Sequence, residues 1–205
     1  MEGTQRGLLL VLSAPSGGGK GTVLKEMFAQ DGNLRLSVSA TTRAPRPGEV
    51  DGQQYYFLSQ EEFEQRIASG GMLEYAQYVG HYYGTPRAPV EKWLDEGRDV
   101  VLEIEVQGGQ QVKKLCPGCV SVFLMPPSME VLESRLRGRG TEEDAVVRRR
   151  LEKAGEEIPH AAQYDYIVYN DRLEDAVADL QAILRAEKRK LERNRDCIER
   201  VLSTC

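Results

Sequence analysis

The feature that most constrains the fold is a glycine-rich stretch between an apolar segment and an amphipathic one. Residues 7–14, GLLLVLSA, form a continuous apolar run that ends in a turn signal, which is typical of a strand buried on both faces. Three glycines and Lys20 follow. The next segment, 21–30, has apolar residues at helical spacing, at Val23, Leu24, Met27 and Phe28. A strand, a glycine loop, a lysine and a helix in this order predict a loop whose backbone N–H groups bind phosphate.

The loop departs from the usual pattern G-x-x-x-x-G-K-[ST] at two positions. Ala14 replaces the first glycine, and Gly21 replaces the hydroxyl residue that usually contacts magnesium. Magnesium keeps several of its waters, so it can be bound through these waters and through the phosphates. We therefore expect Mg²⁺ to bind together with ATP, without a direct protein ligand. A plain turn is the alternative interpretation, which the flanking strand and helix disfavour. The loop residues expected to bind ATP are Ala14, Pro15, Ser16, Gly17, Gly18, Gly19, Lys20, Gly21 and Thr22.

Length and composition favour one domain of an acidic protein. The chain has 205 residues, 40% hydrophobic and 29% charged, with a net charge of −5. This balance disfavours nucleic acid as a partner of the whole chain. No segment approaches the ~20 apolar residues of a membrane span. The apolar run Leu8–Leu12 is also shorter than the core of a signal peptide. We therefore expect a cytoplasmic protein without a membrane partner.

Strands and helices alternate along the whole chain. Strands are predicted at 99–106, 120–127 and 164–171, and short strands with loops over 35–59. Helices are predicted at 59–70, 87–97, 128–140 and 141–158, and from 174 onwards. This order predicts an α/β sandwich of three layers with a mostly parallel central sheet.

Several side chains mark the ends or faces of these elements. Ser59 and Glu62 form a capping box, Ser128 is a further N-cap, and Thr141 with Asp144 is a weaker one. Glu103 and Glu105, two residues apart in a predicted strand, should face the same side. The charged segment 185–196 is predicted to be a solvated helix face.

Four cysteines are present, two of them in a C-x-x-C at Cys116 and Cys119. This spacing allows redox chemistry or half of a zinc site. Cys197 and Cys205 are distant in sequence, and His81 and His160 have no ligand spacing. We therefore favour a turn with free thiols in a reducing compartment.

Two further segments supply groups for a second substrate. The segment SVSATTRAPRPGEVDGQQYYF contains Ser39, Arg43, Arg46 and Tyr55. Two guanidinium groups and a phenol can hold one phosphate through charge-assisted hydrogen bonds. The segment GGMLEYAQYVGHYYGT adds Glu74, Tyr83 and Thr85. By itself, Glu74 is as compatible with a surface glutamate before a strand as with an acceptor for two donors of a ligand.

These segments together with LEIEVQG and GRGTEE resemble the guanylate kinase family, from the N-terminus to about residue 185. The resemblance implies that the guanidinium and phenol groups of Arg43, Arg46, Tyr55 and Tyr83 bind the phosphate of GMP. It also implies that Ser39, Glu74 and Thr85 recognise guanine, with Glu103 and Glu105 towards the acceptor nucleoside.

A helical lid is a further implication of the resemblance. It identifies Arg135, Arg139 and Arg150 as lid residues and places Asn170 near the donor adenine, while Arg148 and Arg149 are left as solvated side chains. Lys20, Arg43 and the three lid arginines are then the expected catalytic groups. One domain, 1–205, would comprise a core (1–34, 96–127 and 159–205), a mixed GMP-binding subdomain (35–95) and the lid (128–158).

The expected reaction is direct in-line phosphoryl transfer from ATP to GMP, and to dGMP, giving ADP and the nucleoside diphosphate. One alternative is another small-molecule kinase, such as adenylate kinase or the phosphonate-pathway kinase that acts on ribose bisphosphate. A second is a non-catalytic guanylate-kinase-like interaction module, although Lys20 and the lid arginines are present. The sequence makes no prediction between a monomer and a homo-oligomer.

Overall fold

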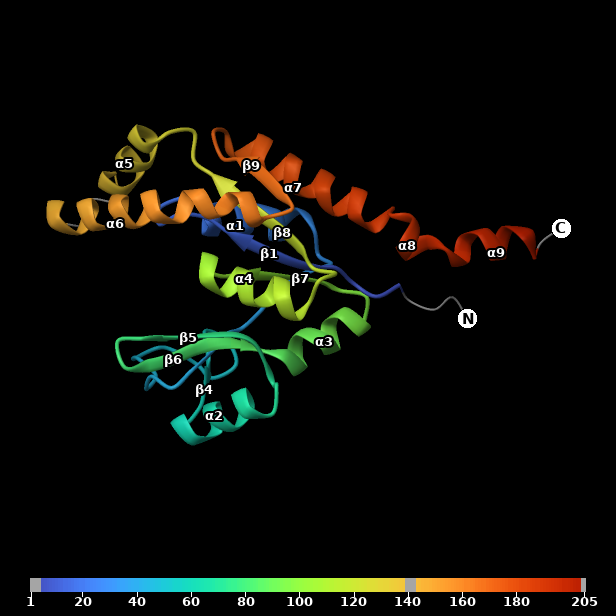
Figure 1. The fold of residues 1–205 in the computed structure, drawn as a ribbon, viewed down its shortest axis with the longest axis horizontal. Coiled ribbons are helices and arrows are strands. Elements are labelled where there is room, and N and C mark those ends of the chain that lie inside the picture. The colour runs from blue at the N-terminus through green and yellow to red at the C-terminus, as the bar shows by residue number, and fades with distance from the viewer. Residues whose placement is uncertain (1–4, 139–142, 204–205) are drawn as a thin grey trace.

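A five-stranded parallel sheet forms the centre of the molecule in this computed structural model, which describes residues 5–138 and 143–203 (Figure 1). The strand order is β2-β7-β1-β8-β9, and every neighbouring pair is parallel. The strands are β1 (Leu9–Ser13), β2 (Leu34–Leu36), β7 (Asp99–Glu103), β8 (Val120–Met125) and β9 (Tyr166–Tyr169).

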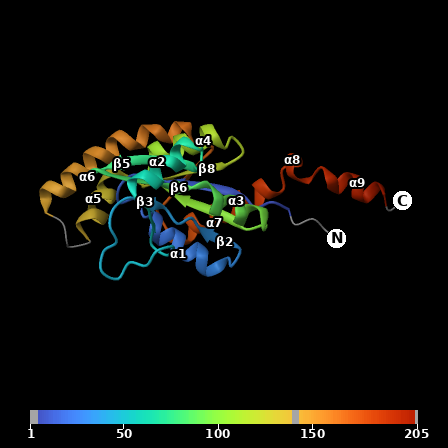
Figure 2. The same ribbon diagram turned by 90° about the horizontal axis from the view of Figure 1, so that it is seen from below.

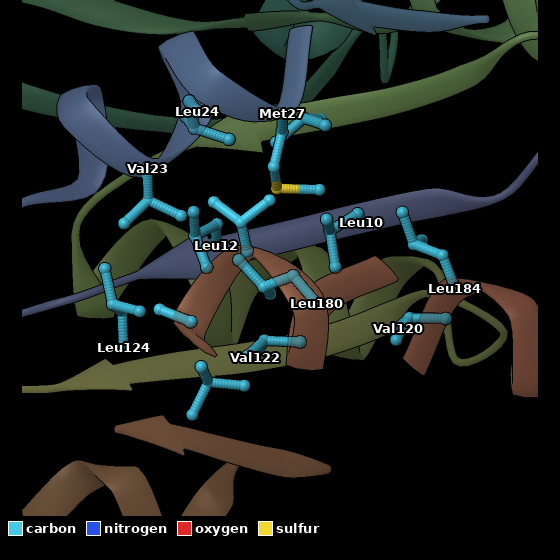
Figure 3. Packing of buried hydrophobic residues seen from close by; sticks show 14 of the residues in the cluster. Leu10, Leu12, Val23, Leu24, Met27, Val120, Val122, Leu124, Leu180 and Leu184 are labelled. Atoms are coloured by element: carbon cyan, nitrogen blue, oxygen red, sulfur yellow. The ribbon is translucent and has the colours of Figure 1, made fainter. Parts of the chain in front are cut away.

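Helices cover both faces of this sheet, which confirms the predicted three layers. On one face, α1 (Lys20–Gln30) and α7 (Leu173–Lys188) pack their apolar stripes against β1 and β8. Figure 3 shows Met27 and Leu180 converging on Leu10 and Leu12 there. On the other face lie α3 (Arg87–Asp95) and α4 (Val106–Leu115).

A second, mixed sheet lies beside the first and is separated from it by α4 (Figure 1). Its order is β4-β3-β6-β5, in which β3 and β4 are parallel and the other pairs antiparallel. The strands are β3 (Ala40–Thr41), β4 (Tyr56–Phe57), β5 (Met72–Tyr78) and β6 (His81–Pro86). Helix α2 (Gln60–Ala68) packs on it through Phe63, and the predicted capping box of Ser59 and Glu62 is confirmed.

Two helices, α5 (Met129–Arg137) and α6 (Asp144–Glu157), form a separate pair with a small core of their own. Ser128 caps α5 as predicted, since its hydroxyl accepts from the Val131 N–H. The predicted start of the next helix is wrong: α6 begins at Asp144 with Glu143 as its N-cap, and Thr141 lies outside the described residues. A 3₁₀ turn, η1 (Ile158–Gln163), leads from α6 to β9.

The strand predicted over 99–106 is too long, and α4 was not predicted at all. β7 ends at Glu103, so Glu105 is not a strand residue but the N-cap of α4. Gly108 and Gly109 in the first turns of α4 lower its helix propensity and hide it from a sequence pattern. Both carboxylates are nevertheless exposed while Ile104 between them is buried, so they do face away from the core together.

The charged C-terminal segment is less solvated than its composition predicts. Glu187 is buried and accepts a hydrogen bond from the Tyr166 hydroxyl at 2.5 Å, and Lys188 forms an ion pair with the buried carboxylate of Asp99. These partners lie on β9 and β7, which the local pattern does not reveal. Two short helices, α8 (Leu191–Asn194) and α9 (Asp196–Leu202), then extend away from the body (Figures 1 and 2).

The C-x-x-C segment is a turn between α4 and β8, as predicted. Cys116 ends the helix, its carbonyl accepts from the Cys119 N–H at 2.9 Å, and both thiols are free. Burial raises the pKa of Cys119 to about 11. No helix of the described residues is long and apolar enough to cross a membrane.

Candidate active site

The glycine loop between β1 and α1 has the backbone conformation that phosphate binding requires. Gly17 and Gly19 have φ values of 86° and 90°, in the left-handed region that favours glycine. Gly19 is the N-cap of α1, and no side chain caps that helix. The first N–H groups of a helix have no intrahelical acceptor and attract anions. The start of α1 therefore has no side-chain cap for its N–H groups, an arrangement that favours an anion.

Two elements distant in sequence pack closely on this loop. A Cβ at Gly17 would lie 2.7 Å from a methyl carbon of Leu136 on α5, and one at Gly19 would lie 2.5 Å from Nδ2 of Asn170. The Asn170 amide, 6% exposed, donates to the carbonyl of Gly18 at 2.8 Å. Arg135 donates from Nη2 to the Asn170 backbone carbonyl at 2.7 Å. The predicted residue Asn170 thus contacts the loop directly, and the predicted residue Arg135 lies beside it through the Asn170 carbonyl.

The second guanidinium nitrogen of Arg135, Nη1, is buried and has no hydrogen-bond partner in the part of the chain that the structure describes. A buried donor without a partner costs about 1–3 kcal/mol. A ligand that accepts a hydrogen bond from it would remove this cost.

Lys20 lies among carboxylates. Its Nζ donates to the Ala14 carbonyl at 3.2 Å. Burial lowers the pKa of the Lys20 ammonium, while three nearby carboxylates act in the opposite direction, those of Glu103, Glu157 and Glu105. Glu103, the last residue of β7, and Glu105, the N-cap of α4, therefore lie close enough to Lys20 for their charges to act on it.

Glu157, at the end of α6, makes a contact that no sequence pattern predicts. Its Oε2 accepts from the backbone N–H of Ser16 in the glycine loop at 3.2 Å. Lys153, one turn earlier, forms ion pairs with Glu157 at 3.5 Å and with Glu105 at 3.1 Å. A carboxylate thus accepts from an N–H group of the glycine loop, and because 141 residues separate it from Ser16, no local motif could have indicated it.

The start of α1 is open to solvent where the usual motif has a hydroxyl. Gly21 and Thr22 are exposed, and a Cβ at Gly21 would meet no atom within 4 Å. Among residues 5–138 and 143–203, no group of three or more His, Cys, Asp or Glu side chains is arranged to hold a metal ion.

A second cluster lies on the mixed sheet and is centred on Arg43. Its guanidinium carbon lies 5.6 Å from the ring centroid of Tyr55, and the Tyr55 and Tyr83 rings are 6.0 Å apart, edge to face. The predicted residues Arg43, Tyr55 and Tyr83 therefore lie close together in the structure. The guanidinium of Arg46 is exposed, but its backbone N–H belongs to the cluster through Glu49.

Glu49 is the cluster residue that the sequence analysis missed. Both of its carboxylate oxygens accept from Nη2 of Arg43, at 2.9 and 3.0 Å, and Oε2 also accepts from the Arg46 N–H at 2.7 Å. The Arg43 guanidinium holds the pKa of Glu49 below its usual range. Glu49 follows Arg46 by three residues, across a turn in which Gly48 has a φ of 88°. This spacing is the sequence signal that could have identified Glu49.

Glu74 and Thr85 form a buried pair on the two long strands of the mixed sheet. They are direct cross-strand partners of β5 and β6, and the Thr85 hydroxyl donates to Oε1 of Glu74 at 2.7 Å. Glu74 is only 7% exposed, and burial raises the pKa of its carboxyl. Tyr83, two residues before Thr85, shares its face of the sheet. Ser39 is half-buried, and its carbonyl accepts from the Tyr56 N–H.

The remaining predicted residues are on α6 and the segment before it. Arg150 is half-buried on α6, whereas Arg148 and Arg149 are exposed. Arg139 lies outside the described residues.

Known proteins of one kind match the chain over most of its length. A family model described as guanylate kinase matches residues 6–187. The guanylate kinase of Lactococcus lactis subsp. lactis is 54% identical over 189 residues, 92% of either chain. That of Clostridioides difficile is 47% identical over 194 residues, 95% of either chain. The crystal structure of guanylate kinase from Anaplasma phagocytophilum has a TM-score of 0.71 at 38% identity, covering 93% of this chain and 90% of that one. The chain described here therefore belongs to the guanylate kinase family.

Proposed function

We propose that this chain transfers a phosphoryl group from ATP to GMP, and to dGMP, giving ADP and the corresponding diphosphate. Family membership supports the reaction. Within the site, the observation that most favours a guanine nucleotide as acceptor is the buried pair of Glu74 and Thr85. An ionised carboxylate fixed through one oxygen can accept from N1–H and the 2-amino group of guanine, and adenine offers neither donor in that pattern.

The donor ATP binds at the glycine loop. Backbone N–H groups of Gly17, Gly19 and the start of α1 hold its phosphates, while the Gly18 N–H donates to the Pro15 carbonyl and keeps the loop in shape. Lys20 neutralises the charge of the phosphates. The unpartnered Nη1 of Arg135 supports a ligand contact there, because an acceptor on ATP would satisfy it. Asn170 holds the loop through Gly18 and lies beside the donor nucleotide.

Magnesium fits this site when it arrives with ATP. The exposed carboxylates of Glu103 and Glu105 lie close enough to influence Lys20, and Gly21 leaves open space at the start of α1. These carboxylates would hold the ion through its water, which is how magnesium is commonly bound. Its contribution when bound is to neutralise charge on the transferred phosphoryl group.

The acceptor GMP binds on the mixed sheet. Its phosphate is held by the guanidinium and phenol groups of Arg43, Tyr55 and Tyr83, with the exposed Arg46 closing on it. Binding replaces the Glu49 carboxylate, which is an anion already bound to Arg43. Guanine is recognised by Glu74 and Thr85 and is flanked by Ser39.

Transfer is direct and in line, with arginines of the lid supplying positive charge and excluding water. The lid residues are Arg135, Arg139 and Arg150. We propose three subdomains: a core, a GMP-binding part and a lid over 128–158. The predicted GMP-binding part, 35–95, includes residues that the structure joins to the core: β2 pairs with β7, and Val90 and Leu94 of α3 pack in the core cluster.

The test is an acceptor panel in a coupled assay that measures ADP release. GMP and dGMP should be phosphorylated, and AMP and UMP should react about 10⁴-fold more slowly, since a site built to hydrogen-bond one ligand rejects an analogue that leaves its polar groups unpaired by such a factor. Equal rates with AMP, or no reaction with GMP, would overturn the proposed function.

A further inference from the structure

Helix α4 fills the space between the two sheets, at the point where guanine recognition is proposed (Figure 1). It contacts both β1 and β5. Val112 of α4 belongs to the same core cluster as Leu73, which immediately precedes Glu74 on β5. The position of this helix therefore determines how far β5 can approach the core.

Gly108 of α4 lies directly against the Glu74 carboxylate. A Cβ at this position would lie 2.9 Å from Oε2, 3.4 Å from Cδ and 3.5 Å from Cγ of Glu74. The first of these distances is shorter than a non-bonded contact allows. Because the carboxylate is the end of a flexible side chain, whereas Gly108 and Gly109 of the helix are buried, a methyl group here would move the carboxylate and not the helix.

A second contact holds the neighbouring residue of β5. Oε1 of Gln111 accepts from the Tyr75 N–H at 3.1 Å, and Nε2 of the same side chain donates to the Tyr75 carbonyl at 3.0 Å. β5 is the edge strand of the mixed sheet, and the Gln111 amide pairs with it as a neighbouring strand would. A side-chain amide offers the donor and the acceptor that this arrangement uses.

The pair of glycines in α4 supports a steric role. A Cβ at Gly109 would lie 2.6 Å from the Tyr164 hydroxyl oxygen and 3.2 Å from Oγ of Ser13, on the core side. The helix is thus confined on both sides, by Glu74 and by Tyr164. Glycine is disfavoured inside a helix, so two in succession indicate that close packing here outweighs helix propensity.

We infer that Gly108 and Gln111 are positioning residues for guanine recognition. Gln111 fixes the β5 backbone at Tyr75 against α4, and Gly108 leaves the space in which the Glu74 carboxylate can face the N1–H and 2-amino group of the base. This inference rests on the proposed function, because it assumes that Glu74 is the group that contacts guanine.

The test compares GMP with inosine monophosphate, which lacks the 2-amino group. In Gly108→Ala the added methyl group shifts Oε2, while Oε1 remains bound to Thr85. Loss of one hydrogen bond to a charged group weakens binding about tenfold or more. The Kd of GMP measured by calorimetry should therefore rise by about that factor. The Kd of inosine monophosphate should rise less, because this nucleotide has no 2-amino group to lose a hydrogen bond. The ratio of the Kd of inosine monophosphate to that of GMP should therefore fall.

Gln111 is tested by a conservative and a disruptive variant. Gln111→Leu removes both hydrogen bonds to Tyr75 and should raise the KM for GMP with kcat at saturating GMP retained. Gln111→Glu keeps the acceptor for the Tyr75 N–H but places a carboxylate oxygen, which has no proton to donate, against the Tyr75 carbonyl oxygen. It should therefore resemble Gln111→Leu. In both variants the KM for ATP should stay within about twofold of the unchanged protein.

Gly155→Ala is the matched control, because Gly155 is also a helical glycine and a Cβ there would meet no atom within 4 Å. It should leave the ratio of the two Kd values unchanged. A thermal unfolding curve for each variant identifies any that fails to fold. If Gly108→Ala fails, the two Kd values are compared in Gln111→Leu instead, and Gln111→Met replaces Gln111→Leu if that variant fails. An unchanged preference for GMP in the folded Gly108 variant would overturn the inference while the proposed function stands. Absence of GMP turnover in the unchanged protein would instead overturn the function.

Discussion

Replacing the Glu74 carboxylate by an amide, in Glu74→Gln, should abolish most of the selectivity for guanine. The carboxylate is 7% exposed and already accepts from the Thr85 hydroxyl at 2.7 Å, so it cannot turn far from the base. Two hydrogen bonds from guanine to a charged acceptor contribute about 3–6 kcal/mol together. Glutamine keeps one acceptor oxygen and directs its NH₂ group at a donor of the base. A loss of about 3 kcal/mol follows, which is roughly a hundredfold in affinity.

The assay is the coupled measurement of ADP release, with GMP and ATP varied in turn. The KM for GMP should rise about a hundredfold and that for ATP should change little. The melting temperature of Glu74→Gln is the control for folding, and the direction of the Glu74 pKa shift predicts its change. Because burial raises the pKa of Glu74, the ionised form is disfavoured in the fold, and a neutral glutamine should leave the melting temperature unchanged or higher.

The same shift predicts a dependence on pH. As the pH falls through the raised pKa of Glu74, the carboxyl becomes protonated and can no longer accept from both guanine donors. The KM for GMP should then rise at a pH where an ordinary glutamate, with pKa about 4.3, is still ionised. Protonation favours the folded state here, so this change occurs without loss of stability. A KM that rises less than fivefold in Glu74→Gln, or a pH profile identical to that of the unchanged protein, would refute the assignment of Glu74.

Three further substitutions test the phosphate sites. Lys20→Met should abolish turnover with a normal melting temperature, and near-normal activity would contradict the role of the glycine loop. Arg43→Ala should raise the KM for GMP about tenfold or more and that for ATP little, whereas equal effects on both substrates would count against two separate phosphate sites. Glu157→Gln removes a carboxylate from the Ser16 N–H, so calorimetry should show ATP binding about three- to thirtyfold tighter. Weaker binding would mean that this carboxylate assists ATP and does not compete with it.

The features that sequence patterns predicted are those encoded locally. The capping box at Ser59, the strand and helix around the glycine loop, and the alternation of strands and helices all depend on residues close in the chain. The helix after Glu105 was hidden because its two glycines satisfy a packing requirement imposed by Glu74 and Tyr164. Helix propensity alone therefore argued against a helix that the tertiary structure stabilises.

The contacts that could not be predicted from the sequence are those between segments far apart in the chain. The carboxylate of Glu157 reaches the glycine loop from the end of α6, and Gln111 reaches Tyr75 across 36 residues. The burial of Glu187 depends on Tyr166, which lies on a different element. The residue types of the site were visible in the motifs, whereas the groups that position them or compete with ligands required the three-dimensional arrangement.

Simultaneous binding of the two nucleotides is the most direct test of the account. In calorimetry, GMP should bind the protein with one-to-one stoichiometry, and it should bind again after the glycine loop has been saturated with magnesium and a non-hydrolysable ATP analogue. Two independent sites predict a second one-to-one titration with an affinity for GMP that is the same or higher. Displacement of one nucleotide by the other, or a protein that binds neither nucleotide, would contradict the presence of two separate nucleotide sites.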